Sequence, residues 1–214
     1  MIWKWDFALE ILPALLKATQ LTILATLLGF AVSVVLGLFL AILNRSRSAV
    51  VRGTVVSVVE FIRSTPLLVQ LLFGVAITPS WAPLWVIGTI VLGIHYATYM
   101  SEVYRAGIDG VPKGQWEAAT ALNLPMRRTW SAVILPQAIR RVIPALGNYL
   151  VSMFKETPLL LAIGVLELVG TAKGIQGETF RAVEPYTLAG LIFLVLSIPS
   201  AYFVRWLEVR FGKG

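Results

Sequence analysis

Between Lys17 and Arg45 the chain carries no charged residue. This run is long enough to cross the roughly 30 Å hydrocarbon core of a bilayer as one helix. It is too long for the apolar core of a cleavable signal peptide, so we expect it to be retained. Four further apolar segments follow, over residues 54–77, 84–101, 142–171 and 186–202. The sequence therefore predicts about five membrane-spanning helices.

The composition agrees with a chain that lies mostly in lipid. Of the 214 residues, 57% are hydrophobic and only 14% are charged, whereas soluble domains carry about 25% charged residues. About five spans use up the length, so a separate soluble domain does not fit. We predict an all-α polytopic membrane helical bundle that forms a single domain over residues 1–214. The chain has no cysteine, which excludes disulfides and thiol chemistry.

The first 17 residues are expected to differ from the spans. Residues 1–17 are amphipathic and include Trp3 and Trp5. Such a segment is typical of an interfacial helix that lies along the membrane.

Small residues recur every four positions along the first span. They are Ala25, Gly29, Ser33, Gly37 and Ala41. In lipid, helix association depends on shape rather than on hydrophobicity, and small residues allow two backbones to approach closely. The spacing predicts that another helix packs along this stripe; the ordinary glycine and alanine content of a span is the alternative explanation.

The basic residues give the expected orientation. The net charge is +7, and the bases lie at the ends of the apolar segments. The first loop, the loop over residues 102–141 and the C-terminal tail are rich in bases, whereas residues 78–83 carry none. By the positive-inside rule the basic loops are cytoplasmic, which places the N-terminus outside and the C-terminus in the cytoplasm. This account of the charge leaves no reason to expect nucleic acid as a partner.

One short helix is predicted inside the basic loop. Residues 117–122 are strong helix formers. Pro112 stands at the entrance, where proline is tolerated, and Asn123 at the exit, where a left-handed residue is favoured. Pro125 prevents continuation. We predict a helix of about three turns that lies apart from the spans.

This helix offers a surface to a partner. Its expected docking residues are Gln115, Trp116, Glu117, Ala118, Ala119, Leu122 and Asn123. An amphipathic helix that rests on lipid headgroups is the alternative.

Two segments share one pattern. Residues 63–68 read Arg-Ser-Thr-Pro-Leu-Leu, and residues 155–160 read Lys-Glu-Thr-Pro-Leu-Leu. Each proline breaks its helix. Counted from the expected starts of the two spans, both bases fall near the bilayer midplane, where a charge costs at least about 2.5–3.5 kcal/mol; later starts would place them at the cytoplasmic rim. Broken spans at matching depth point to a transport site.

We expect the two segments to line a polar passage for a zwitterion. A carboxylate would meet Arg63 or Lys155, and an ammonium or amidinium would meet Glu60 or Glu156. The expected passage residues are Glu60, Arg63, Thr65, Lys155, Glu156 and Thr157. Ion pairing that only holds the bundle together is the alternative, with Glu60 placed three residues before Arg63 and so on the same helix face.

Two other polar residues stand in apolar segments. His95, the only histidine, is expected to be a hydrogen-bonded residue of the bundle rather than a proton relay. Glu167 is expected near the outer end of its segment, either at an external gate or at the membrane interface.

The basic loop resembles the EAA loop of permease subunits of binding-protein-dependent ABC importers. That family pattern is Glu-Ala-Ala, three residues, Gly, about nine residues, then Ile-x-Leu-Pro. The chain matches it at residues 117–119 and at residues 134–136, departs from it at Asn123, and lacks the residue between Ile134 and Leu135. Asparagine also adopts the left-handed turn, so the first departure puts little in doubt.

The resemblance extends over nearly the whole chain. Residues 63–70, together with Glu102 and Arg105, resemble the polar-amino-acid branch of the family. Within that branch the tryptophan-rich start and residues 7–13 are most similar to permeases of ectoine/hydroxyectoine importers. This last match is much weaker, because permeases for different solutes look alike.

The resemblance implies a type I importer permease without enzymatic activity. The EAA helix would be the coupling helix that sits in a cleft of a cytosolic ATPase dimer, which binds ATP and magnesium. A second permease, identical or homologous, and an external solute-binding protein would complete an importer in the bacterial inner membrane. Consistent with this, the chain has no phosphate-binding Gly-rich Lys-Ser/Thr loop, no His-Glu-x-x-His helix and no Gly-x-Ser-x-Gly turn. We expect no metal site or cofactor on this chain.

Two other classes of protein stay open on the residues alone. An autonomous channel or ion-coupled carrier would use the midplane charges without a partner. A membrane scaffold would transport nothing.

Overall fold

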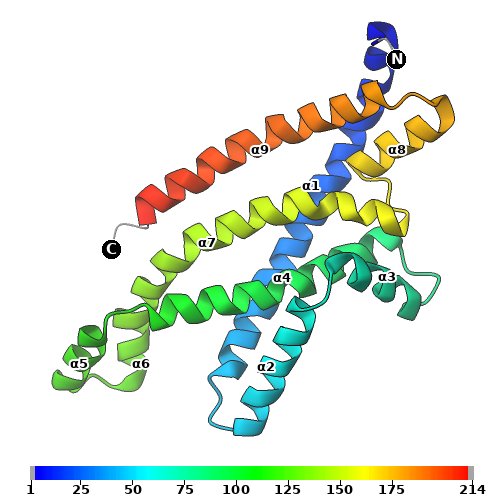
Figure 1. Ribbon diagram of the computed structural model, residues 1–214. Coiled ribbons are helices and arrows are strands. Elements are labelled where there is room, and N and C mark those ends of the chain that lie inside the picture. The colour runs from blue at the N-terminus through cyan, green and yellow to red at the C-terminus, as the bar shows by residue number, and fades with distance from the viewer. Residues whose placement is uncertain (1–2, 212–214) are drawn as a thin grey trace.

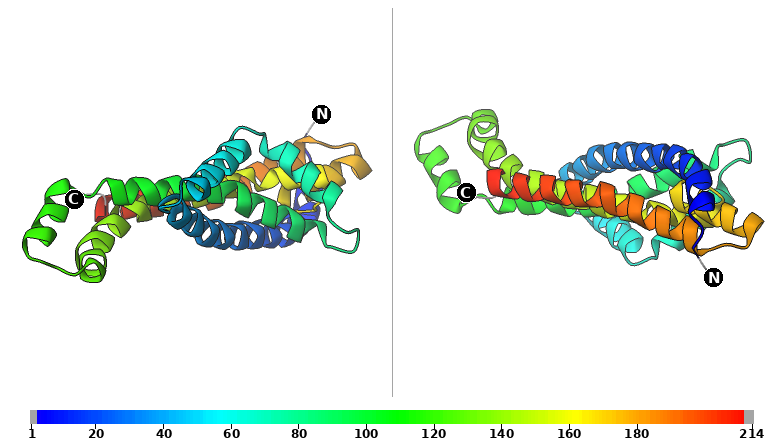
Figure 2. Two further views of the ribbon diagram at one scale, coloured as in Figure 1. Left: turned by 90° about the horizontal axis from the view of Figure 1, so that it is seen from below. Right: turned by 90° about the horizontal axis from the view of Figure 1, so that it is seen from above.

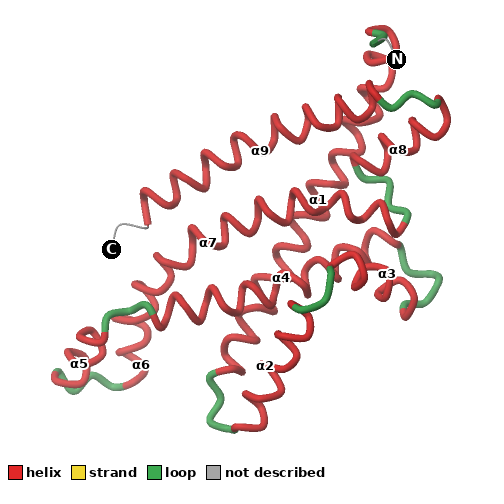
Figure 3. Tube along the Cα trace, viewed as in Figure 1, coloured by secondary structure: helices red, strands yellow, loops and turns green. Residues whose placement is uncertain are grey.

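The computed structural model describes residues 3–211, and over these residues it is helical without strands (Figure 3). The elements are α1 (Trp5–Asn44), α2 (Ala49–Arg63), α3 (Leu67–Ile77), α4 (Leu84–Asp109), α5 (Lys113–Ala121), α6 (Met126–Arg128), the π-helical turn η1 (Thr129–Ile134), α7 (Leu135–Glu156), the 3-10 turn η2 (Thr157–Ile163), α8 (Leu168–Thr179) and α9 (Val183–Phe211). The predicted all-α bundle is confirmed.

The number of spans also agrees with the prediction. Within residues 3–211, α1, α4 and α9 are each long and apolar enough to cross a membrane. Two further spans are bent pairs: α2 with α3, at 106°, and the run from Met126 to Ile163 with α8, at 43°. Counting each bent pair as one crossing gives up to 5 spans.

The ends of the elements sort to the two ends of the bundle (Figures 1 and 2). The N-terminus, the α3–α4 connection and the α8–α9 connection lie at one end. The α1–α2 loop, α5, α6 and the C-terminal end of α9 lie at the other. The basic loop over residues 102–141 is therefore at the end opposite to the N-terminus, as an odd number of crossings requires.

The separate interfacial helix expected over residues 1–17 is wrong for the part that the structure describes. Helix α1 runs for 40 residues from Trp5 without interruption. Its first turns belong to the bundle, because Ile11 and Leu15 are buried against Leu168 of α8 and Ala189 of α9. The first two residues of that segment lie outside the described residues.

The stripe of small residues on α1 is buried where α4 crosses it, as predicted. A Cβ atom added at Gly37 would lie 2.4 Å from Met100 Cβ and 2.8 Å from the Ala97 carbonyl oxygen. On the α4 side, a Cβ at Gly93 would lie 2.6 Å from Val32 Cγ1. Since two helices of ordinary residues cannot approach so closely, these glycines set the α1–α4 spacing.

Both proline segments interrupt their helices, but not in the same way. At the first, Ser64 and Thr65 leave the helix, and Pro66 starts α3 at a sharp angle. At the second, the chain tightens into the 3-10 turn η2, which ends at Gly164 with a left-handed φ of 84°. The bounds of the spans differ accordingly from those expected. The second begins earlier than 54, and the fourth runs over 126–179 rather than 142–171.

Glu167 joins α8 to α1. Its side chain is fully buried and caps α8, accepting hydrogen bonds from the Gly170 N–H at 2.6 Å and the Val169 N–H at 3.1 Å. The Thr22 hydroxyl of α1 donates to Glu167 Oε2 at 3.5 Å and accepts from the Leu168 N–H at 3.1 Å. Capping N–H groups that would otherwise be unpaired gives this buried carboxylate a structural role.

The α1–α4 contact yields the first testable prediction. Replacement Gly37→Ala places a methyl group against Met100 and the α4 backbone, so we expect it to destabilise the protein by about 1–3 kcal/mol. Gly53→Ala is the matched control, because a Cβ there meets nothing within 4 Å. Thermal unfolding of the detergent-solubilised protein should show a lowered midpoint for the first variant only. Equal midpoints would show that α1 and α4 separate without cost.

Candidate functional site

Helix α5 ends as the sequence predicts. Asn123 has a left-handed φ of 50°. Its N–H donates to the Thr120 carbonyl at 2.9 Å, and the Leu124 N–H donates to the Ala119 carbonyl at 3.0 Å. These two bonds form a complete Schellman motif, with asparagine in the place that glycine usually takes. The helix has 9 residues, about two and a half turns rather than three.

The inner face of α5 packs on its own hairpin rather than lying free of it. Trp116 is half-buried and contacts Trp130 edge to face, with ring centroids 5.3 Å apart. Ala119 is buried. Gln115 Oε1 accepts a hydrogen bond from Gln137 Nε2 of α7 at 3.1 Å. Trp116 and Ala119 therefore hold α5 on its hairpin, whereas Gln115 makes this bond at an exposed position.

The outer face of α5 is open. Glu117 and Ala118 are exposed, and Leu122 is 72% exposed. Gln115 and Asn123 are exposed as well, so five of the seven predicted docking residues are open to solvent, and their docking role stays a prediction.

A second group of polar residues surrounds the middle of α4. Gln70 of α3 connects α4 to the first proline break by hydrogen bonds to both. Its Nε2 donates to the Ile62 carbonyl at 2.7 Å and to Thr65 Oγ1 at 2.7 Å. Its Oε1 lies 3.0 Å from His95 Nδ1. Because Nε2 is the donor, Oε1 is the acceptor, and Nδ1 of His95 carries the proton in this pair. The interpretation of His95 as a hydrogen-bonded bundle residue fits this contact.

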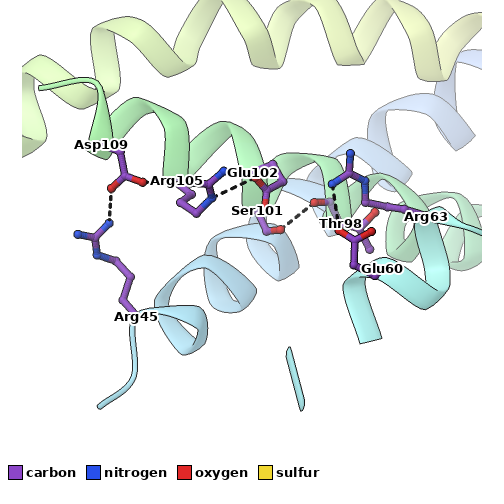
Figure 4. A network of polar contacts seen from close by, with 8 residues as sticks. All are labelled: Arg45, Glu60, Arg63, Thr98, Ser101, Glu102, Arg105 and Asp109. Atoms are coloured by element: carbon purple, nitrogen blue, oxygen red, sulfur yellow. Dashed lines mark hydrogen bonds and ion pairs between the residues drawn. The ribbon is translucent and has the colours of Figure 1, made fainter. Parts of the chain in front are cut away.

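Arg63 extends from the first break over the same part of α4. Its guanidinium carbon lies 5.1 Å from the centre of the Tyr99 ring. Glu60 Oε1 is 3.7 Å from Arg63 Nη1, the i,i+3 pair expected from the sequence (Figure 4). Tyr99 also contacts Tyr149 of α7, with centroids 5.6 Å apart.

Glu156 approaches this group from the second proline segment. Its carboxylate lies near enough to the Tyr96 hydroxyl to interact with it electrostatically. The Tyr96 ring contacts the rings of Tyr99 and Tyr149, with centroids 6.0 and 6.2 Å apart. A cation, Arg63, thus lies over Tyr99, and an anion, Glu156, lies near Tyr96 of the same group of tyrosines. We call Arg63, Tyr96, Tyr99, Tyr149 and Glu156 the tyrosine cluster.

Other predicted passage residues lie elsewhere. Lys155 is exposed and lines two grooves between α7 and α9. Tyr186 also lines the first groove, and Arg205 also lines the second. Thr157 is fully buried, with its hydroxyl bonded to the Phe154 carbonyl at 2.7 Å. Neither residue joins the tyrosine cluster. Adjacent residues on a helix point about 100° apart, so the cluster can receive Glu156 and not Lys155.

Sequence reasoning missed Gln70 and Tyr149. Gln70 is the one polar side chain within the apolar α3. Tyr149 stands seven residues before Glu156, and this spacing puts both on one face of α7. Both residues could have been predicted from the sequence if the polar residues near each proline break had been searched for a common site.

The described residues offer no place for a resident metal ion. Within residues 3–211, no three His, Cys, Asp or Glu side chains come close enough together to hold one. The arrangement provides charges, hydroxyls and aromatic faces, which suit reversible binding.

Comparison with known proteins places these features in a context. Residues 33–213 match the family of binding-protein-dependent transport system inner membrane components. The chain is 45% identical to a probable amino-acid ABC transporter permease of Sinorhizobium fredii, over 99% of this chain and 96% of that protein. It is 34% identical to an arginine transport system permease of Corynebacterium glutamicum, over 99% of this chain and 73% of that one. The crystal structure of an amino acid ABC transporter with histidines has a chain that is 32% identical, with a TM-score of 0.90 and 98% and 100% of the two chains covered.

The left-handed residue at the end of α5 provides a prediction. In the variant Asn123→Ala the motif still requires a positive φ, which alanine adopts less readily than asparagine. We expect this strain to destabilise the end of α5 by about 1–2 kcal/mol. Asn123→Gly should leave the Schellman motif unchanged. Hydrogen exchange of the α5 amides reports this directly, with faster exchange expected in the alanine variant alone. Identical exchange in both variants would mean that the cap does not hold α5.

Proposed function

Because this chain belongs to the family of binding-protein-dependent transport system inner membrane components, we propose that it is the membrane-spanning subunit of an ATP-driven importer for a small polar zwitterion. The observation that carries the proposal is the hairpin around α5. A short helix, capped at its end and packed on a tryptophan pair, presents Glu117, Ala118 and Leu122 outward at the end of the bundle. ATP hydrolysis is assigned to a separate ATPase, which would dock on this surface.

The partners follow from the same geometry. A bundle of five crossings makes half of a pathway, so a second permease, identical or homologous, is needed to close it. Each permease would engage one subunit of an ATPase dimer through α5. An external binding protein would deliver the solute at the end that holds the N-terminus.

The proposed orientation is that of the inner membrane with the α5 end in the cytoplasm. The hairpin and the start of α7 carry Arg127, Arg128, Arg140 and Arg141, of which all but the half-buried Arg141 are exposed. Short loops rich in arginine stay on the cytoplasmic side. The N-terminus would then face outward and the C-terminus the cytoplasm.

The solute class is argued from the tyrosine cluster. Arg63 suits a carboxylate, and Glu156 suits an ammonium or amidinium group. Tyrosine faces beside them suit a compact cation or a flat ring. An amino acid fits this pattern, as does ectoine or hydroxyectoine. The name of the arginine permease from Corynebacterium glutamicum supports the amino-acid class.

Alternating access would link the two sites. ATP binding would close the ATPases and displace α5, and the permeases would open outward to receive the solute. Hydrolysis would return them to the inward-facing arrangement. Thr65 and Thr157, next to the two prolines, stand at the breaks where the helices can change angle.

Docking on α5 can be tested by charge. Replacement Leu122→Arg places a cation in the middle of the proposed contact, and we expect co-purification of the ATPase to fall about tenfold or more, as for a central interface residue. Val50→Arg is the matched control, since Val50 is 78% exposed and also lies beyond the α1–α2 loop at that end of the bundle. Equal loss in both variants would speak against α5 as the docking site.

The solute site can be tested by two neighbouring residues. Glu156→Gln removes the anion from the tyrosine cluster, and we expect uptake to fall about tenfold or more. Lys155→Met removes a charge that lies outside the cluster, so uptake should be retained. The assay is ATP-driven uptake of labelled arginine, glutamine and ectoine into vesicles that hold the permease, its ATPase and its binding protein. Loss in Lys155→Met alone would move the site to the α7–α9 groove, and uptake without ATPase would make the protein an autonomous carrier.

A further inference from the structure

Arg45 occupies an unusual junction at the cytoplasmic end of the bundle. It caps α1, and its backbone N–H donates to the Ile42 carbonyl at 3.1 Å, while the Ser46 N–H donates to the Leu43 carbonyl at 2.9 Å. Its side chain makes two contacts with other elements. Nη1 lies 3.0 Å from Asp109 Oδ1 of α4, and the guanidinium carbon lies 5.7 Å from the centre of the Trp130 ring. One side chain thus joins α1, α4 and the hairpin that carries α5.

The contact with Trp130 leads directly to α5. Trp130 belongs to the π-helical turn η1, and its other neighbour is Trp116 of α5. π-Helical turns are rare and often occur at functional sites. A displacement of α5 must move Trp116 against Trp130, and through Trp130 it reaches the Arg45 guanidinium.

The contact with Asp109 leads along α4. Asp109 Oδ2 accepts from Arg105 Nη1 at 3.2 Å, and Arg105 Nη2 donates to Glu102 Oε2 at 2.7 Å (Figure 4). These pairs brace the last two turns of α4 on its outer surface. The same helix carries His95, Tyr96 and Tyr99 further along.

We propose that Arg45 is a positioning residue that makes α5 and the α1–α4 pair move as one body, so that movement imposed on α5 reaches the tyrosine cluster. The inference rests on the proposed function, in which an ATPase moves α5. Since the close packing at Gly37 and Gly93 holds α1 and α4 together, a force that reaches either helix at this end is carried by both.

The contacts of Arg45 are suited to transmission rather than to stability. The Arg45 and Asp109 side chains are 40% and 47% exposed, and exposed ion pairs contribute little to the free energy of unfolding. The helix cap uses only backbone atoms and survives loss of the side chain. Removal of the side chain should therefore leave the fold intact and free α1 from the hairpin, while α4 stays in contact with the hairpin through Ile108.

Arg47 provides a matched control. It lies two residues further along the same loop, is exposed, and makes no ion pair or ring contact with the residues at positions 3–211. The variants Arg45→Ala and Arg47→Ala change the same charge in the same loop, but only the first breaks the junction.

The first experiment measures ATP hydrolysis and uptake side by side in vesicles that hold the complete importer. We expect Arg45→Ala to keep its ATPase, its thermal midpoint and its basal hydrolysis, while uptake per ATP hydrolysed falls roughly fivefold or more. Arg47→Ala should match the unmodified complex, and Arg45→Lys, which keeps the charge, should recover part of the loss. Unchanged uptake per ATP in Arg45→Ala would overturn the inference alone. Failure of the unmodified complex to take up any solute with ATP would overturn the proposed function itself.

The second experiment measures whether the two helices that Arg45 connects move together. The chain has no cysteine, so spin labels on it attach only at the introduced Thr120→Cys on α5 and Phe39→Cys on the exposed side of α1, and the distance between these two labels within one copy is measured. With Arg45 present, this distance should stay constant when ATP binds to the complex, because both helices move together. In Arg45→Ala it should change on ATP binding. A distance that responds to ATP equally in both proteins would show that Arg45 does not join the two helices.

Discussion

The close approach of α1 and α4 is the contact on which the other features depend. In lipid, helices gain nothing by hiding apolar surface from one another, so their association depends on how well their surfaces fit. Gly37 and Gly93 supply that fit from opposite sides, and any added Cβ would collide with the facing helix. With α4 fixed against the longest helix, two parts of it acquire defined positions: His95 and the neighbouring tyrosines at its middle, and Asp109 at its end.

The two proline breaks then arrange polar groups around α4 by different local means. At the first, a turn at Ser64 and Thr65 bends the chain by 106° and brings Arg63 over Tyr99. At the second, the chain tightens into a 3-10 turn that leaves Glu156 at the last position of α7, beside Tyr96, and the 43° bend comes later, between Ile163 and Leu168. The similar sequence of the two segments thus produces a sharp bend at the first proline and a tightened helical turn at the second.

Features set by local chemistry were readable from the sequence. The exit of α5 at Asn123 depends on one left-handed residue and its own backbone, and the stripe containing Gly37 depends on helical spacing alone. Features set by tertiary packing were not. Trp116 was expected to point toward a partner, but it packs on Trp130. Trp130 is placed there by a π-helical turn, which the spacing of apolar residues does not predict. Lys155 was grouped with Glu156 by sequence, although consecutive residues of a helix face different neighbours. The start of α1 looked interfacial because its burial comes from α8 and α9, far along the chain.

The amide of Gln70 shows how chemically demanding one position can be. It donates hydrogen bonds to the Ile62 carbonyl and the Thr65 hydroxyl and accepts one from the His95 ring. A carboxylate of equal length has no proton to give, and an ammonium has no lone pair to accept with. Only a side chain that both donates and accepts at that length can make all three contacts at once, so this position is constrained by hydrogen bonding, whereas its buried neighbours Leu67 and Leu71 are constrained by packing.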